Sequence, residues 1–504
     1  MTSFKLTQSA LAAQRTPKGN HMTYLGIDLG TSGLRALLID QDGAAIGSVV
    51  RHFDVCHPNH GWSEQDPSAW VAALEDAVAE LRAEFAQFQN LKGIGVAGHM
   101  HGATLIDEKG VVLRPCILWN DTRASAQAAV LDQTKDVRAI SGNIVFAGFT
   151  APKLEWVRAH EPDLFAKVHK VLLPAAYLNY YLTGEYVSDM SDSAGTSWLD
   201  VAARDWSDYL LDVSHMRQDQ MPRLVEGSTA AGQLRANIAA RWGLGQAVTI
   251  AGGAGDNAAA ACGIGAMNEG QGFISLGTSG VLMAARDGCK PAPETAVHTF
   301  CHAVPDRWYQ MGVMLSATDS LNWLGRITGR SPAELTDALG KTLASPSKVR
   351  FLPYLSGERT PHNDVDIRGC LTGLDVNTGP ETLAAAVIEG VSFGLRDSLE
   401  ALKATGAKLD RIVAIGGGTA SQYWVELLAT VLDLPIDLPS GGEFGAALGA
   451  ARLGLVASGG GQVEDVMTTP VISQTILPNL ALRDQYNDAY AAFCAAYPAI
   501  KSIQ

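Results

Sequence analysis

Two apolar runs near the start of the chain flank a glycine turn and predict a β-hairpin. The first run ends at Asp28 and the second covers residues 34–39, with the pentapeptide Leu-Gly-Thr-Ser-Gly at 29–33 between them. The same pentapeptide returns at 276–280, again after one apolar run and before another. An identical turn in the same setting indicates that the chain contains two related halves.

Segments with helical or strand periodicity follow each hairpin and predict an α/β protein. In the first half we expect helices over 70–88, 151–157, 177–182 and 230–242, and strands over 91–97 and 247–251. In the second half we expect strands over 273–276 and 411–415, and helices over 382–401, 421–432 and 444–453. Strands that alternate with helices in both halves predict duplicated α/β layers around a central crevice.

The length of the chain supports this division. With 504 residues the chain exceeds what one compact core usually holds, so two large domains are expected. We predict an unstructured lead-in over residues 1–21, a first domain over 22–265 and a second domain over 266–504. A junction between two domains is a common place for a ligand cleft.

Composition excludes several classes of function. Hydrophobic residues make up 47% of the chain and charged residues 18%, which is typical of a well-packed soluble protein. A formal net charge of −14 disfavours a nucleic-acid surface, and the absence of an apolar run of about 18 residues disfavours a membrane helix. The seven scattered cysteines contain no Cys-x-x-Cys pair, so we expect a cytoplasmic protein without disulfides or structural zinc.

Both pentapeptide turns carry groups that suit a phosphate. Backbone N–H groups of a glycine turn can face an anion, and Thr and Ser hydroxyls add further donors. The alternative is that both are ordinary tight turns, in which Gly, Thr and Ser are common. Asp28, just before the first turn, is either a turn cap or an outer ligand of Mg²⁺.

Asp256, close to the expected domain junction, is the candidate general base. It follows the strand over 247–251 and a glycine cluster, which place its carboxylate on rigid backbone. A carboxylate there would accept the proton of an attacking alcohol, as phosphoryl transfer requires. The alternative role for Asp256 is the N-cap of a helix that begins near Ala258.

Two other patterns point to different chemistry. Residues 253–258 match a loose dinucleotide fingerprint, which would suit an NAD-dependent dehydrogenase. The next strand ends in a Gly-Thr-Ser-Gly turn rather than in the acid that such a fold needs, so phosphoryl transfer is favoured. His99 and His101 are spaced to share one side of a strand, but no third His or Cys lies near them in sequence, which favours ligand contacts over a metal site.

Several motifs together resemble the FGGY carbohydrate kinases. They are residues 26–32, 98–103, 252–259 and 352–361, supported by 119–123 and 416–418. The resemblance is strongest to members that phosphorylate D-xylulose to D-xylulose 5-phosphate. It implies an ATP-dependent kinase of the α/β class, with duplicated actin-like ATPase domains (ribonuclease H-like) that flank a central cleft.

The resemblance also implies roles for individual residues. Asp256 would accept the proton, and Asp28 would act near the phosphates and Mg²⁺, through water. The sugar would be bound by Met100, His101, Asp256 and Asn257. The nucleotide would be bound by Gly30, Thr31, Ser32, Gly277, Thr278, Gly416 and Gly417.

The chain departs from the family pattern at two places. His99 stands where Gln is usual, beside the expected sugar contacts, and Thr419-Ala420 stands where a basic residue usually follows the glycine triplet. Kinases for D-ribulose, L-ribulose or a polyol remain alternatives, as does a non-catalytic sugar sensor on the same fold. Whether the protein forms a homodimer is left open.

Overall fold

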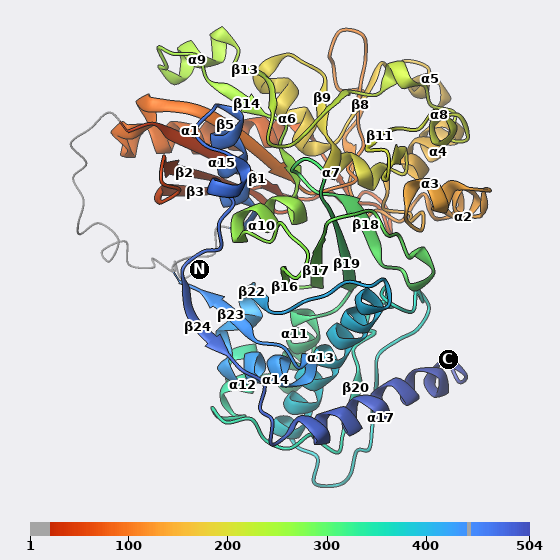
Figure 1. Cartoon of the computed structure of the whole chain (residues 1–504). Helices are drawn as coiled ribbons and strands as arrows, with labels where there is room; N and C mark the ends of the chain where they lie inside the picture. Colours follow the sequence, from red (N-terminus) through yellow and green to blue (C-terminus); the bar gives the residue numbers. More distant parts are fainter. Residues whose placement is uncertain (1–20, 441–444) are drawn as a thin grey trace.

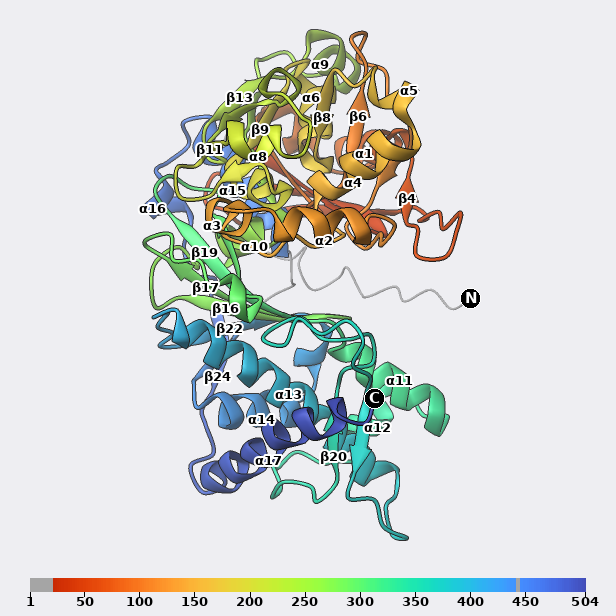
Figure 2. The same ribbon diagram turned by 90° about the vertical axis from the view of Figure 1, so that its right-hand side faces the viewer.

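A computed structural model describes residues 21–440 and 445–504. Two mixed β-sheets of seven strands each organise these residues, and helices cover both sheets. Figures 1 and 2 show two lobes, with green strands of the second sheet between them. The expected lead-in over 1–21 lies outside the described residues apart from its last residue.

The first sheet begins with the hairpin that contains the first pentapeptide. Its strands are β1 (Thr23–Gly30), β2 (Gly33–Asp40), β3 (Ala45–His52), β5 (Leu91–Gly98), β13 (Ala230–Gln233), β14 (Thr249–Ala251) and β15 (Ala254–Gly255). They lie in the order β13-β14-β5-β1-β2-β3, and β15 also pairs with β5. β1 and β2 are antiparallel and close at Gly30 and Gly33, whereas β1 and β5 are parallel.

The second sheet contains the second pentapeptide in the same kind of hairpin. Its strands are β16 (Gly272–Leu276), β17 (Gly280–Arg286), β18 (His298–Cys301), β19 (Trp308–Met314), β22 (Ile412–Ile415), β23 (Ile436–Pro439) and β24 (Ile472–Ile476). They lie in the order β18-β19-β17-β16-β22-β23-β24. β16 and β17 close at Leu276 and Gly280, and β16 is parallel to β22. The prediction of two matching hairpins is therefore confirmed.

Helices and short strands complete both halves. The helices before residue 266 are α1 (Pro67–Glu84), α2 (Ser125–Gln133), α3 (Val137–Ser141), α4 (Thr150–His160), α5 (Pro162–Phe165), α6 (Pro174–Thr183), α7 (Met190–Ser193), α8 (Asp208–Asp212), α9 (Ala236–Trp242) and α10 (Asp256–Ile264). The later helices are α11 (Thr318–Thr328), α12 (Pro332–Asp337), α13 (Pro380–Ala404), α14 (Gln422–Leu432), α15 (Gly445–Ala457), α16 (Val463–Val466) and α17 (Arg483–Lys501). The short strands are β4 (Glu64–Gln65), β6 (Thr104–Ile106), β7 (Cys116–Ile117), β8 (Lys170–Leu172), β9 (Val187–Asp189), β10 (Leu199–Asp200), β11 (Asp205–Trp206), β12 (Arg223–Val225), β20 (Arg350–Leu352) and β21 (Cys370–Thr372).

Helix α15 comes late in the chain but packs on the first sheet, against β1 and β5. Figure 1 shows this blue helix among the red strands of the upper lobe. Two glycines permit the approach, because a Cβ atom on Gly26 would lie 1.9 Å from the carbonyl oxygen of Ala447, and one on Gly95 would lie 1.9 Å from that of Ala450. Any side chain at either glycine would push the helix off the sheet.

Side-chain contacts also join the two halves along β18 and β19. Asn143 pairs with Thr299, donating to its carbonyl oxygen at 2.9 Å and accepting from its N–H at 2.9 Å. Trp308 of β19 donates its indole N–H to the carbonyl oxygen of Val201 at 2.8 Å. The second sheet therefore has one edge fixed against the first half.

The predicted elements agree with the structure at most positions. The expected helices near 70–88, 151–157, 177–182, 382–401 and 421–432 are confirmed, as are the strands near 91–97, 273–276 and 411–415. The helix over 230–242 is wrong in its first part, because Ala230–Gln233 is strand β13 and only Ala236–Trp242 is helical. Antiparallel pairing with β14 overrides the helix propensity of these alanines.

Candidate active site

Three strands of the first sheet end side by side, and most of the predicted site residues emerge at this edge. In β1, Leu29 lies opposite Gly98 of β5, and Gly98 in turn lies opposite Gly255 of β15. The N–H of His99 donates to the carbonyl oxygen of Leu29 at 2.9 Å, which fixes the chain as it leaves β5. The carboxyl ends of parallel strands are the usual place for a ligand in α/β sheets.

Asp256 is the first residue of helix α10. Its Oδ1 accepts hydrogen bonds from the backbone N–H of Asn257 at 2.7 Å and from the Asn257 side chain at 2.8 Å. Burial raises the pKa of Asp256 to about 6, and the two hydrogen bonds from Asn257 limit the rise. The alternative in which Asp256 is the N-cap is wrong, since Gly255 occupies that position. Asp256 is therefore ionised at neutral pH and held by its neighbour, as a general base requires.

Asp28 lies close enough to Asp256 for the two carboxylates to repel each other. Burial raises the pKa of Asp28 to about 7, the charge of Asp256 adds to the rise, and Arg35 opposes it. Arg35 faces Asp28 directly across the β1–β2 hairpin. Within residues 21–440 and 445–504, no hydrogen bond reaches the Asp28 carboxylate, so it can accept a water or a cation.

Met100 lies against the backbone that carries Asp256. A Cβ atom on Gly255 would be 2.9 Å from Cγ of Met100, so this glycine lets the methionine touch the turn. Tyr309 of β19 donates its hydroxyl to the Met100 sulfur at 3.8 Å. Tyr309 of the second sheet thus contacts Met100 at the edge of the first sheet.

His101 presents one ring nitrogen to a possible ligand. Its Nδ1 lies 2.7 Å from the carbonyl oxygen of Gly195, and its ring stacks on Phe149 at 4.4 Å between centroids. Burial and nearby Lys153 lower the pKa of His101 to about 3, so the ring is neutral. Because a carbonyl oxygen only accepts, Nδ1 carries the proton and Nε2 is left as an acceptor.

His99 does not share a site with His101. Its ring packs edge-on against Trp70 at 5.6 Å, and neither ring nitrogen has a hydrogen-bond partner among the described residues. Burial lowers the pKa of His99 to about 3. The expectation that both rings face the same side is wrong, because β5 ends at Gly98 and His101 has a φ of +69°.

The second sheet brings together another set of predicted residues, Gly277, Thr278, Gly416 and Gly417. The carbonyl oxygen of Gly277 accepts from the N–H of Thr318 at 2.9 Å, which seats the turn at the start of α11. Gly416 has a φ of +97°, and a Cβ atom there would lie 2.6 Å from the carbonyl oxygen of Leu276. Around a Cβ atom on Gly417, no described atom lies within 4 Å. These glycines therefore form a backbone surface with open space beside it.

The two sets form a first-sheet group (Asp28, Met100, His101, Asp256 and Asn257) and a second-sheet group (Gly277, Thr278, Gly416 and Gly417). The first pentapeptide turn adjoins the first-sheet group, and the Thr31 hydroxyl accepts from the Trp119 indole at 2.9 Å. Among the described residues, no hydrogen bond or ion pair joins the Gly30–Ser32 turn to the Gly277–Thr278 turn. That the two turns grip one ligand stays a prediction.

The sequence did not indicate the residues that hold the backbone just before Asp256. Ser191 of α7 accepts from the N–H of Gly255 at 3.1 Å, and its hydroxyl donates to Asp189. Asp189 also caps α7 by accepting from the N–H of Ser191 at 2.7 Å. The only local signal was an acid at the end of a short apolar run, which is too common to single out.

Asp192 is a second buried carboxyl near Asp256. Both of its oxygens lack a hydrogen-bond partner in the part of the chain that the structure describes. Burial, then Asp189 and then Asp256, raise the pKa of Asp192 well above its ordinary value. Asp192 is therefore the group in this region most inclined to keep its proton.

The described residues contain no group of three or more His, Cys, Asp or Glu arranged to hold a metal ion. All seven cysteines are free. No helix in the described part of the chain is both long and apolar enough to cross a membrane.

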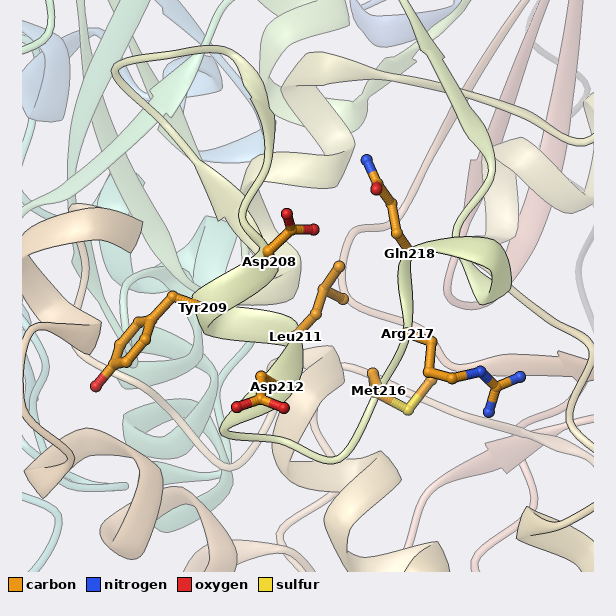
Figure 3. Close-up of a pocket in the computed structure, with 7 residues that line it drawn as sticks. All are labelled: Asp208, Tyr209, Leu211, Asp212, Met216, Arg217 and Gln218. Carbon is orange, nitrogen blue, oxygen red and sulfur yellow. The ribbon is translucent and has the colours of Figure 1, made fainter.

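A surface hollow of about 440 Å³ lies elsewhere, between α8 and the segment that follows it. Seven residues line it: Asp208, Tyr209, Leu211, Asp212, Met216, Arg217 and Gln218. Figure 3 shows that Tyr209 and Gln218 point in different directions rather than toward one centre. The predicted site residues are outside this set, so the hollow is unrelated to their chemistry.

Comparison with known proteins finds carbohydrate kinases that match nearly the whole chain. The N-terminal domain model of the FGGY family of carbohydrate kinases matches residues 23–263, and the C-terminal domain model matches residues 272–458. The chain is 47% identical to the xylulose kinase of Escherichia coli over 86% of its own length and 90% of that protein. It is 36% identical to the xylulose kinase of Lactococcus lactis over 85% of its length and 88% of that protein.

A solved structure is similar over almost the full length. The crystal structure of a "xyloylose kinase" from Brucella ovis is 54% identical, with a TM-score of 0.94, and the match covers 96% of this chain and 100% of that chain. Plasmodium falciparum glycerol kinase, at 18% identity and a TM-score of 0.86, shares the fold, with 95% of this chain and 98% of that chain covered. The expected duplicated actin-like fold is confirmed.

Proposed function

Because the chain belongs to the FGGY family of carbohydrate kinases, we propose that it transfers the γ-phosphoryl group of ATP to D-xylulose, forming D-xylulose 5-phosphate. Its similarity to xylulose kinases from several bacteria supports this sugar. The observation that carries the proposal is Asp256, a carboxylate held by Asn257, with Met100 packed against the glycine just before it. The reading as an NAD-dependent dehydrogenase is not supported.

The proposed reaction begins with proton transfer to Asp256. As the sugar hydroxyl loses its proton to this carboxylate, its oxygen forms a bond to the γ-phosphorus, and the bond from that phosphorus to ADP breaks. Asn257 keeps Oδ1 of Asp256 in place, and Nε2 of His101 accepts from another sugar hydroxyl. A positioned base of this kind typically accelerates a reaction by about 10² to 10⁴.

The proposed nucleotide site combines backbone groups from both sheets. The turns Gly30–Ser32 and Gly277–Thr278 would hold the phosphates, and Gly416 with Gly417 would lie against the adenosine. The open space at Gly417 and the backbone surface beside Leu276 are what such a contact needs. The proposal also includes two domains, over residues 22–265 and 266–504, that close around the ligands.

Mg²⁺ is part of the proposed chemistry. The Asp28 carboxylate fits a water-mediated ligand, because Asp256 adds negative charge beside it and Mg²⁺ typically uses one or two carboxylates with waters and phosphates. When bound, Mg²⁺ neutralises charge on the phosphate oxygens. The free cysteines and the use of ATP agree with a cytoplasmic location, which is part of the proposal.

A coupled assay of ADP release with Asp256→Asn tests the base. We expect kcat with D-xylulose to fall by about 10² to 10⁴, while the sugar still binds, because the amide cannot take the proton. Asp484→Asn, at an exposed carboxylate far along the chain in α17, is the matched control and keeps full activity. Turnover that survives Asp256→Asn would contradict the role of the base.

The same assay with other acceptors tests the sugar. D-ribulose, L-ribulose, xylitol and D-arabitol are compared with D-xylulose at equal concentration. D-xylulose is expected to give the highest kcat/KM. Higher turnover with another acceptor would reassign the substrate, and sugar binding without ADP release from any acceptor would indicate a sensor.

A further inference from the structure

Arg359 lies in the motif 352–361, to which no role has been assigned so far. Its guanidinium carbon stands 4.1 Å from the centre of the Phe146 ring, so an arginine of the second half packs on an aromatic residue of the first. Within the described parts of the chain, the guanidinium makes no hydrogen bond and no ion pair. A partly buried cation with five unused donors calls for an acceptor.

The residues on either side of Arg359 are fixed to the second sheet. Thr360 exchanges hydrogen bonds with Val313 of β19, at 3.0 Å in each direction, and its hydroxyl donates to the carbonyl oxygen of Ala296 at 2.9 Å. Glu358 accepts from the N–H of Leu315 at 3.1 Å. The Arg359 side chain therefore projects from an anchored segment, and its position is set by the fold rather than by a flexible loop.

Aromatic rings connect Arg359 to the proposed sugar contacts. Phe146 meets Phe149 at 5.4 Å, and Phe149 stacks on His101 at 4.4 Å. The positive charge of Arg359 helps to lower the pKa of both His101 and His298, whereas the pKa of Asp256 is set by burial and by Asn257. Arg359 thus acts on the His101 side of the site and not directly on the base.

The chemistry of the ketose substrate identifies the sugar atom that needs a hydrogen-bond donor such as Arg359. A 2-ketopentose closes to a furanose through its O5, so a molecule that reacts at O5 must be the open chain, with its C2 carbonyl free. Asp256 takes the O5 end, and the carbonyl lies three carbons away. A carbonyl oxygen that is removed from water needs a hydrogen-bond donor, because an unpaired buried acceptor is costly. His101 Nε2, an acceptor, cannot serve it.

We propose that Arg359 donates hydrogen bonds to the C2 carbonyl oxygen of the open-chain ketose and so selects ketoses over the corresponding polyols. The proposal rests on the proposed function and assigns a further specificity residue to the same site. Since Arg359 comes from the second half and Asp256 from the first, a bound ketose contacts both halves at once.

Titration of Arg359→Gln with D-xylulose and with xylitol, the polyol formed by reducing that carbonyl, tests the proposal. We expect the Kd for D-xylulose to rise about 10- to 100-fold, as for a lost hydrogen bond to a charged group, and the Ki of xylitol to change little. Arg359→Lys, which keeps a charge and a donor, should recover part of the affinity. Arg326→Gln, an exposed arginine, is the control and should leave both constants unchanged.

Equal loss for D-xylulose and xylitol would overturn the proposal, because it would give Arg359 only a structural role. A second measurement uses the wild-type protein and does not depend on a variant that folds. The carbonyl carbon resonance of D-xylulose labelled with ¹³C at C2 should move downfield on binding, and an unshifted resonance would also overturn the proposal. If wild type binds D-xylulose without phosphorylating it, the proposed function fails while the assignment of Arg359 is still decided by these shifts.

Discussion

The first-sheet group and the second-sheet group are built in different ways. In the first, side chains hold one another: Asn257 binds Asp256, Met100 touches the turn before it, and Ser191 supports that turn from behind. In the second, glycines leave the backbone bare, and Gly417 has open space beside it. Well-positioned side chains can distinguish one sugar from similar sugars. Backbone N–H groups are sufficient for phosphates, which are the same in every nucleotide.

Acid pH should affect the first-sheet group most strongly. The pKa of Asp256 is raised to about 6 and that of Asp28 to about 7, so each carboxyl keeps its proton to a higher pH than an ordinary aspartate. The base works only when ionised, so kcat/KM for the sugar should fall by about tenfold per pH unit once the pH drops below about 6, the pKa of Asp256. The measurement is the pH profile of ADP release, and a profile that stays flat down to pH 5 would contradict the assignment.

Gly416→Ala should damage the second-sheet group and spare the first. A φ of +97° and a carbonyl oxygen 2.6 Å from the added Cβ atom make alanine strained, which costs about 1–3 kcal/mol before any clash is counted. We expect the KM for ATP to rise by about tenfold, since 1.4 kcal/mol is one factor of ten, while the Kd for D-xylulose stays the same. Gly43→Ala, at a turn outside both groups where φ is +80° and the added Cβ atom meets open space, is the control for backbone strain alone. A similar rise in both variants would mean that the loss of ATP affinity does not come from the second-sheet group.

Ser191→Ala should give the smallest effect, within the first-sheet group. The variant leaves the N–H of Gly255 unpaired, which costs about 1–3 kcal/mol of stability and loosens the backbone before Asp256. We expect a few-fold lower kcat with an unchanged KM for ATP. Ser193→Ala removes a neighbouring buried hydroxyl that pairs with Ser188, so it controls for the loss of a hydroxyl alone. Equal kcat in the two variants would mean that Ser191 does not position the base.

Local pattern predicted the elements that depend on nearby residues. The two hairpins followed from apolar runs around a repeated glycine turn, and the place of Asp256 followed from the strand and glycine cluster just before it. The long helix α13 followed from its apolar spacing. In each case the residues that decide the structure lie within one or two elements of each other.

Contacts between distant segments could not be predicted in this way. Nothing in residues 445–457 shows that this helix packs on β1 and β5, because the matching signal is the absence of side chains at Gly26 and Gly95. The stretch 230–233 is helix-like in composition and becomes a strand only because β14 lies beside it. Likewise, the approach of Arg359 to Phe146 depends on how the two halves meet.

A crystal structure with D-xylulose and a nonhydrolysable ATP analogue tests most directly whether the two groups serve one reaction. We predict that O5 of the sugar lies about 2.6–3.2 Å from the Asp256 carboxylate, the reach of a general base, and that the triphosphate contacts both the Gly30–Ser32 and the Gly277–Thr278 turns. A sugar whose O5 is beyond hydrogen-bond reach of Asp256, or a triphosphate that touches only one turn, would contradict it.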